Sequence, residues 1–187
     1  MPTFLDSFHG NYYIFPGSYS GEMSESSDRV AVIQEQWRRE RPDLDVTPQG
    51  VIGRLHRLAN SLSSELAVVY ARFDLSEGEF DVLATLRRNG APYELAPSEL
   101  AAHTMVTTGA MTKRIDRLVD AGLVTRRSSE GDGRRRVVAL TDAGKTRIDD
   151  AFTAHIANEH RLLETLTRPD RRQLEWILTS WTAARGD

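Results

Sequence analysis

The stretch LAAHTMVTTGAMTKRIDRLVDAGLV, residues 100–124, decides the fold of this 187-residue chain. Its second half predicts a helix, because apolar residues recur there at helical spacing and Gly122 follows where glycine usually ends a helix. The residues predicted to face inward are Met111, Ile115 and Leu118. A turn containing Thr107 or Thr108 precedes this helix, which we expect to end at Ala121.

The flanking sequence completes a winged helix-turn-helix. Upstream, Pro97-Ser98 predicts the cap of a short helix over 99–103, and Ser76-Glu-Gly-Glu79 is a capping box that opens a helix ending near residues 89–90. Downstream, residues 123–127 and 136–140 predict two short strands joined by a polar hairpin. We therefore predict a mainly α fold with a small β-wing, in which residues 76–141 form a DNA-binding lobe.

Longer helices surround this lobe. One is predicted over 24–41, a second starts at Thr47-Pro48, and two more follow Thr141 and end near Leu166 and Ala184. Apolar residues repeat every three or four positions through the second and last of these helices, which is typical of helices that pack against a partner. We expect helices 47–73 and 142–184 to form a homodimer interface.

Residues 1–22 are expected to form a flexible extension of the domain over 23–187. Six of the fourteen aromatic residues lie there among Gly, Ser and Pro, and no helical period is visible. An alternative is that translation starts at Met23. We assign this segment no function.

Charge and composition narrow the class of protein. The net charge is −3, but residues 96–140 hold eight Lys/Arg against five Asp/Glu, and such a local positive lobe can bind phosphates. Without cysteine, the chain has no disulfide and no cysteine-ligated metal. No apolar run reaches the roughly 18 residues of a membrane span, and no secretory signal is visible. We expect a cytoplasmic protein without membrane association.

An enzyme is the alternative from another class, and the sequence argues against it. Gly131-Asp-Gly133 is too short for a phosphate-binding loop and lies in the predicted hairpin. His155 and His160 are the closest histidines, and they lie about 140° apart on a helix, which is poor geometry for one metal. We expect no catalytic residue, metal or cofactor.

Residues 100–124 resemble the recognition-helix region of the multiple-antibiotic-resistance regulator (MarR) family. Asp132-Gly-Arg134, with Val138 and Thr141 in register, resembles the wing signature of that family, and the likeness extends over about 25–184. The resemblance implies a helical dimer with two winged lobes that binds palindromic operators in double-stranded DNA.

Two groups of residues are the candidates for DNA contact. Hydroxyls and cations on the first turn and outer face of the recognition helix can reach phosphates and base edges in the major groove. Arginines at the tip of the wing can enter a narrow minor groove, with Asp132 holding Arg134. The alternative is a solvated surface. The candidates are Thr107, Thr108, Thr112, Lys113 and Arg117 in the helix, and Asp132, Arg134, Arg135 and Arg136 in the wing.

A narrower resemblance is to the urate-responsive branch of this family, which carries a tryptophan on an added N-terminal helix. The ligand residues of that branch map onto Trp37, Asp81, Arg88 and Arg114, and a coupling residue maps onto Arg126. The resemblance implies a repressor released by urate or a related purine anion. Periodicity alone would make Trp37 a packing residue and would place Asp81 and Arg88 in solvent. It places Arg114 at the edge of the inward face of the recognition helix, where we expect it to pair with Asp81. An organic acid, a phenolic compound or no ligand at all are the alternatives.

Overall fold

The computed structural model describes residues 28–104, 107–129 and 132–186. The extension predicted over 1–22 lies outside these ranges. The chain divides into two compact units, residues 1–54 and 55–187, and each is described by itself.

The first unit contains helix α1 and the beginning of α2. Helix α1 (Arg29–Glu40) is capped by Asp28, whose carboxylate accepts hydrogen bonds from two backbone amides of the first turn and also pairs with Arg54. The buried side chain of Gln34 donates to the carbonyl of Val46 at 3.0 Å and fixes the connection that leads into α2. The predicted helix is thus confirmed from residue 29 to the residues before Pro42.

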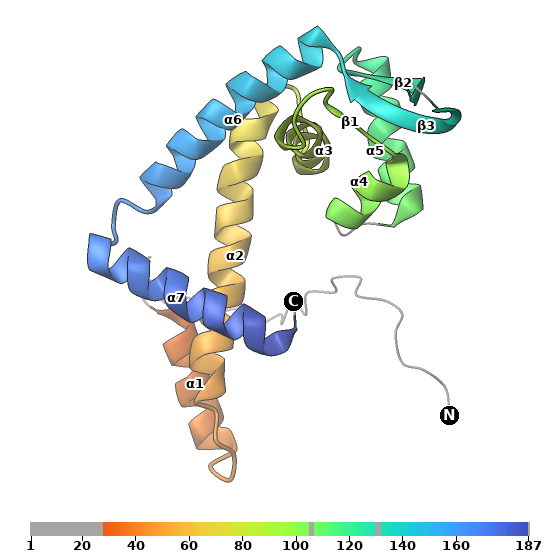
Figure 1. The fold of residues 1–187 in the computed structure, drawn as a ribbon. Coiled ribbons are helices and arrows are strands. Elements are labelled where there is room, and N and C mark those ends of the chain that lie inside the picture. Colours follow the sequence, from red (N-terminus) through yellow and green to blue (C-terminus); the bar gives the residue numbers. More distant parts are fainter. Residues whose placement is uncertain (1–27, 105–106, 130–131, 187) are drawn as a thin grey trace, which may run out of the picture. The chain divides into compact units, whose positions relative to one another are not determined.

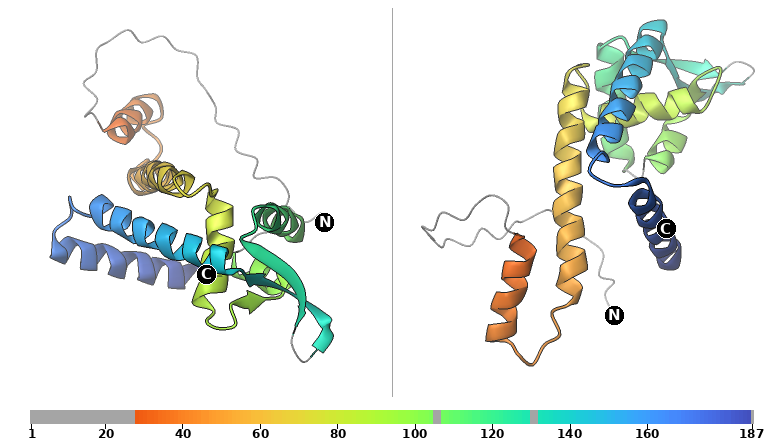
Figure 2. Two further views of the ribbon diagram at one scale, coloured as in Figure 1. Left: turned by 90° about the horizontal axis from the view of Figure 1, so that it is seen from above. Right: turned by 90° about the vertical axis from the view of Figure 1, so that its left-hand side faces the viewer.

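The second unit contains the remaining elements in the predicted order (Figure 1). They are the rest of α2 (Pro48–Ala71), α3 (Glu77–Arg88), β1 (Glu94–Leu95), α4 (Pro97–His103), α5 (Thr108–Asp120), β2 (Val124–Ser129), β3 (Asp132–Leu140), α6 (Asp142–Leu162) and α7 (Arg168–Arg185). Helices α3, α4 and α5 gather beside the small sheet, and the hairpin of β2 and β3 projects away from them (Figures 1 and 2). This arrangement is a winged helix-turn-helix.

Local capping chemistry explains where these helices begin. The capping box predicted at Ser76 is present, with both the backbone amide and the hydroxyl of Ser76 bonded to the Glu79 carboxylate. Thr141 caps α6, as expected, and Thr107, one of the two residues predicted to lie in the preceding turn, caps α5. The helix start predicted at residue 99 is wrong by two positions, because α4 starts at Pro97 and Ala96 is its N-cap.

The sheet has the order β1-β3-β2 and is antiparallel throughout. Both wing strands are longer than the sequence predicts, since pairing extends from Val124 opposite Leu140 to Ser128 opposite Arg136 before the register shifts. The short strand β1 was not predicted, because two residues cannot display an alternating pattern.

The core lies between α3, α4, α5, the sheet and α6. The three residues predicted to face inward from α5 are each 1% exposed. Other fully buried side chains come from every neighbouring element and include Leu83, Leu86, Leu100, Val138 and Ile148. Gly144 brings the first turn of α6 against the start of β2, since a Cβ atom there would lie 2.9 Å from the carbonyl carbon of Leu123 and closer still to its oxygen.

Helix α7 buries none of its residues within the chain. Its exposed apolar side chains include Leu174, Trp176, Ile177, Leu178 and Trp181, and Trp176 is 69% exposed. An uncovered apolar face of this kind agrees with the predicted homodimer interface, which stays a prediction. Among the described residues, no helix combines the length and apolar character that crossing a membrane requires.

Candidate functional site

The outer face of α5 presents the candidate DNA-binding residues of the recognition helix. Thr112, Lys113 and Arg117 are exposed, whereas the residues predicted to face inward on the same helix are buried. The hydroxyl of Thr107 accepts a hydrogen bond from the amide of Ala110 at 3.4 Å, so this residue caps the helix as well as lying at its exposed end. The side chain of Thr108 lies outside the described part of the structure.

Arg117 also connects α5 to α3. Its Nε donates to Oε1 of Glu79 at 2.7 Å, while the other oxygen of Glu79 holds the α3 cap. Burial alone would raise the pKa of Glu79, but hydrogen bonds from Ser76 and the charge of Arg117 outweigh it and lower that pKa. Arg117 remains 61% exposed and so stays accessible to a phosphate.

The wing is joined to the recognition helix at its base. Arg126 on β2, the predicted coupling residue, pairs with Asp116 on α5 at 2.5 Å. Arg127 pairs with Glu94 of β1 at 2.5 Å. Of the four wing candidates, only the side chain of Arg136 is described, and it is exposed. The side chains of Asp132, Arg134 and Arg135 lie outside the described part, although their backbone forms β3.

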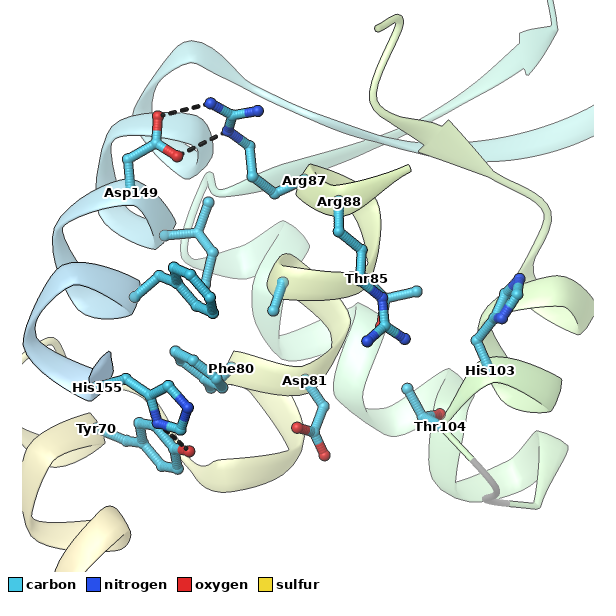
Figure 3. A pocket seen from close by; sticks show the side chains of 13 residues that line it. Tyr70, Phe80, Asp81, Thr85, Arg87, Arg88, His103, Thr104, Asp149 and His155 are labelled. Carbon is cyan, nitrogen blue, oxygen red and sulfur yellow. Dashed lines mark hydrogen bonds and ion pairs between the residues drawn. The ribbon is translucent and has the colours of Figure 1, made fainter. Parts of the chain in front are cut away.

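A cavity of about 690 Å³ lies beside α3, and it brings two of the predicted ligand residues together (Figure 3). Asp81 and Arg88 both line it, so the solvent-facing position that periodicity suggested for them is the open wall of a pocket. The other walls come from α2, α4 and α6. The remaining lining residues are Tyr70, Phe80, Ala84, Thr85, Arg87, His103, Thr104, Ile148, Asp149, Phe152 and His155.

One wall of this cavity is polar. The side chains of Asp81 and Arg88 point the same way from α3, and His103 and Thr104 of α4 lie opposite them (Figure 3). Burial raises the pKa of Asp81, and the Glu77 carboxylate acts in the same direction. The guanidinium groups of Arg88 and Arg114 oppose this shift without cancelling it. The carboxylate is therefore held at an energetic cost, as is common at functional sites.

The opposite wall is aromatic, and sequence reasoning missed it. The rings of Tyr70 and Phe80 stack with centroids 4.2 Å apart, and His155 lies against both. The Tyr70 hydroxyl and Nδ1 of His155 share a hydrogen bond of 3.1 Å, and Nε2 of His155 lies 3.2 Å from Glu159. Burial, with help from nearby carboxylates, raises the pKa of Tyr70 to about 12. The hydroxyl therefore stays protonated at neutral pH.

The third edge of the cavity is an ion pair. Nε of Arg87 donates to Oδ1 of Asp149 at 2.7 Å, which joins α3 to α6. This hydrogen bond is the main reason that the pKa of Asp149 is lowered. The guanidinium of Arg87 also lies 5.1 Å from the ring centre of Tyr93. The pair closes one end of the cavity and leaves Arg88 as the cation directed into it.

The structure corrects one expectation about Arg114. We expected this arginine, on the inner edge of α5, to pair directly with Asp81. Among the residues that the structure describes, no hydrogen bond or ion pair joins the two, and only a longer-range attraction is present. The Arg114 guanidinium lies instead against Gly78, and its Nη1 atom is buried without a hydrogen-bond partner. Arg114 is also absent from the cavity lining.

Two further expectations can be placed. Trp37 belongs to the first unit, where its side chain is 46% exposed, and its role in binding stays a prediction. Within the described ranges, no group of three or more histidine or acidic side chains is positioned to hold a metal ion.

Comparison with known proteins identifies the family. The MarR family model matches residues 73–135. The chain is 41% identical over 149 residues to the HTH-type transcriptional regulator PecS of Dickeya dadantii, covering 80% of this chain and 90% of PecS. It is 31% identical to the HTH-type transcriptional repressor Rv2887 of Mycobacterium tuberculosis, covering 72% of this chain and 93% of Rv2887. A crystal structure of a MarR mutant from E. coli complexed with operator DNA matches with a TM-score of 0.62 and 26% identity. The match covers 73% of this chain and 98% of that MarR chain. The protein is therefore a transcriptional regulator of the MarR family and not an enzyme.

Proposed function

We propose that this regulator represses transcription as a homodimer on a palindromic operator and is released by a small flat anion, urate or a related purine. The observation that carries the proposal is the position of the cavity beside α3. Its walls include α3, which supports the recognition helix, and His103 and Thr104, which end α4 just before the helix-turn-helix turn. A molecule bound there touches the elements that position α5.

DNA contact would come from the exposed face of α5 and from the wing. Support comes from the exposure of Lys113 and Arg117 and from the likeness to a MarR mutant complexed with operator DNA. Phosphate contacts by these cations would fix the register, and Arg134 at the tip of the wing would enter the minor groove. Two lobes related by a twofold axis would read half-sites about one helical turn apart.

Ligand binding would use the polar and aromatic walls together. A cavity of about 690 Å³ is within the usual range for a small-molecule site. Arg88 would hold the anionic edge of the ring, and Phe80 would lie beside its face. Asp81 would accept an N–H group or be repelled, and Trp37, which the family resemblance assigns to ligand binding, would supply a flat stacking surface.

Release from DNA would follow because the bound anion and Asp81 both attract Arg114 of α5. An anion that attracts Arg114 and repels Asp81 changes the balance of charge between the supporting and recognition helices. The Arg126–Asp116 pair would pass a movement of α5 to the wing. A ligand shifts such an equilibrium only by its differential affinity for the two poses, typically about 1–3 kcal/mol.

The test is a fluorescence-anisotropy titration of the operator complex with urate, xanthine and citrate. We expect urate or xanthine to dissociate the wild-type complex. Trp37→Ala should weaken ligand binding, whereas Asp81→Ala or Arg114→Ala should blunt release. Arg29→Ala at the start of α1 is the control for loss of an arginine outside the cavity and outside the predicted dimer helices, and it should respond as wild type. If no anion acts at millimolar concentration, the ligand-gated proposal fails.

A second candidate is a regulator that responds to an organic acid or a phenolic compound. It is favoured by one observation, that the aromatic side chains of Tyr70, Phe80 and His155 line the same cavity as the cation of Arg88. That combination also suits a ring or chain with a single carboxylate. Release by citrate alone in the same titration would keep the cavity as the binding site and replace the purine.

A further inference from the structure

Gly78 occupies an unusual position in the first turn of α3. A Cβ atom added there would lie 2.8 Å from Nη2 of Arg114 and even closer to its Nε and Cζ. Real Cβ atoms do not approach other heavy atoms so closely. The φ angle of Gly78 is not in the positive range, so its backbone conformation does not demand glycine. Glycine is required because any larger side chain would overlap the guanidinium of Arg114.

Because Gly78 has no side chain, the guanidinium of Arg114 occupies the space beside it, and we call this space the Arg114 seat. Gly78 belongs to the supporting helix and Arg114 to the recognition helix, so the seat joins these two elements. Asp81 lies three residues after Gly78, about one helical turn along α3, and is within electrostatic range of the seated guanidinium. This attraction helps to hold the cation in place without a direct pair.

The seat leaves one hydrogen-bond donor unused. Nη1 of Arg114 is buried and donates to no acceptor within the described structure. A buried donor without a partner is costly, particularly on a charged group. An anion that reaches Arg114 would supply the missing acceptor, so the seated form is ready to respond to one.

Glycine is also an unfavourable choice for a helix. Alanine at this position would favour the helical conformation, because glycine loses more backbone freedom on folding. The three atoms that a methyl group there would meet first all belong to the end of the flexible Arg114 side chain, and none of the three is a backbone atom. Gly78→Ala should therefore leave α3 intact and force the guanidinium of Arg114 out of its seat.

We propose that Gly78 is a positioning residue that lodges Arg114 between α3 and α5, and that this lodging is required for the response of α5 to an anion. The second part rests on the proposed function, in which the effector acts on Arg114. The first part concerns only the two residues and can be measured without any ligand.

The test uses the full-length protein and the side-chain Nε–H signal of Arg114 in nuclear magnetic resonance. Arg114→Ala identifies this signal by its loss. In wild type we expect Arg114 Nε–H to exchange with water on the order of tenfold more slowly than in Gly78→Ala. Gly109→Ala is the matched control, because it also adds a methyl group to a helical glycine, but the new Cβ meets no atom of another described residue within 4 Å apart from its neighbours in the chain and in the helix backbone. The control should leave the Arg114 signal unchanged.

The anion titration then tests the consequence of releasing Arg114. We expect Gly78→Ala to raise the urate, xanthine or citrate concentration for half release of DNA at least about fivefold. Gly78→Ala should add nothing in an Arg114→Ala background, because the effect acts through that side chain. Melting temperatures of all variants check that the lobe remains folded.

Three outcomes decide between the ideas. An Arg114 signal unchanged in Gly78→Ala would overturn the seat. A released Arg114 with a wild-type response to the anion would overturn its role in the response. Failure of every anion on wild type would refute the proposed function and with it the role in the response, while the exchange rate would still decide whether the seat exists.

Discussion

Lys113→Ala offers a quantitative test of the DNA-binding face of α5. Lys113 is exposed on the outer side of this helix, and it makes no ion pair among the described residues. Its removal therefore leaves the core and the links to α3 and the wing untouched. If its ammonium group contacts a phosphate, the variant should lose affinity for every DNA sequence to a similar extent.

The magnitude follows from counterion release. Each phosphate contact contributes about 0.9 to the magnitude of the slope of log affinity against log salt concentration. For a homodimer that loses two contacts, the magnitude of this slope should therefore fall by about 1.8. Between about 50 and about 200 mM salt, that difference in slope changes the ratio of wild-type to variant affinity by about 12-fold. A change of only about 0.9 would mean that one subunit makes the contact.

The assay is fluorescence anisotropy on the operator and on a scrambled duplex over this range of salt. Lys145→Ala is the matched control, since Lys113 and Lys145 are the two lysines of the chain and Lys145 lies on α6 near Asp149. We expect the control to keep the wild-type slope. A Lys113→Ala slope equal to that of wild type would refute the assignment of this face of α5 to DNA.

Three further predictions concern stability and the wing. Gly144→Ala should destabilise the fold by about 1–3 kcal/mol, because its methyl group would push the α6 cap away from the backbone of Leu123; urea unfolding beside Gly109→Ala measures this, and a stability equal to wild type would contradict it. Asp81→Asn should raise the melting temperature at neutral pH, because the raised pKa of Asp81 means that its ionised form is disfavoured in the folded protein. This advantage should disappear as the pH falls below the ordinary value of 3.8, where both states are protonated, and a pH-independent difference would refute the cause. Arg134→Ala should weaken operator binding by about 1–3 kcal/mol, and unchanged binding would show that the wing assignment is wrong.

Features of the fold that depend on neighbouring residues could be predicted from the sequence. The capping box at Ser76, the Thr141 cap and the end of α5 at Gly122, whose φ is 69°, are all decided within a few positions of chain. The strand β1 could not be found in this way, because Glu94 and Leu95 become a strand only by pairing with β3, more than 40 residues later.

The cavity, like β1, could not be predicted from the local sequence. Helical periodicity placed Asp81 and Arg88 away from the core, and that direction was right for a helix considered alone. The surface becomes a pocket only because α6 brings Phe152 and His155 beside α3. Those residues come from a helix more than 60 positions away, and nothing in the local pattern of α6 distinguishes them from ordinary packing residues.

Arg114 shows why residue identity alone can suggest the wrong partner. Charge favoured a direct pair with Asp81, and the helical spacing correctly placed Arg114 at the inner edge of α5. The position of the guanidinium depends instead on the atom that Gly78 lacks. Sequence patterns record side chains that are present, so a seat made by an absent one leaves no periodic or electrostatic signal. The remaining clue is energetic: Gly78 stands between Glu77 and Glu79 in a first turn without needing a positive φ. A glycine kept where alanine would favour the helix suggests that the space itself is in use.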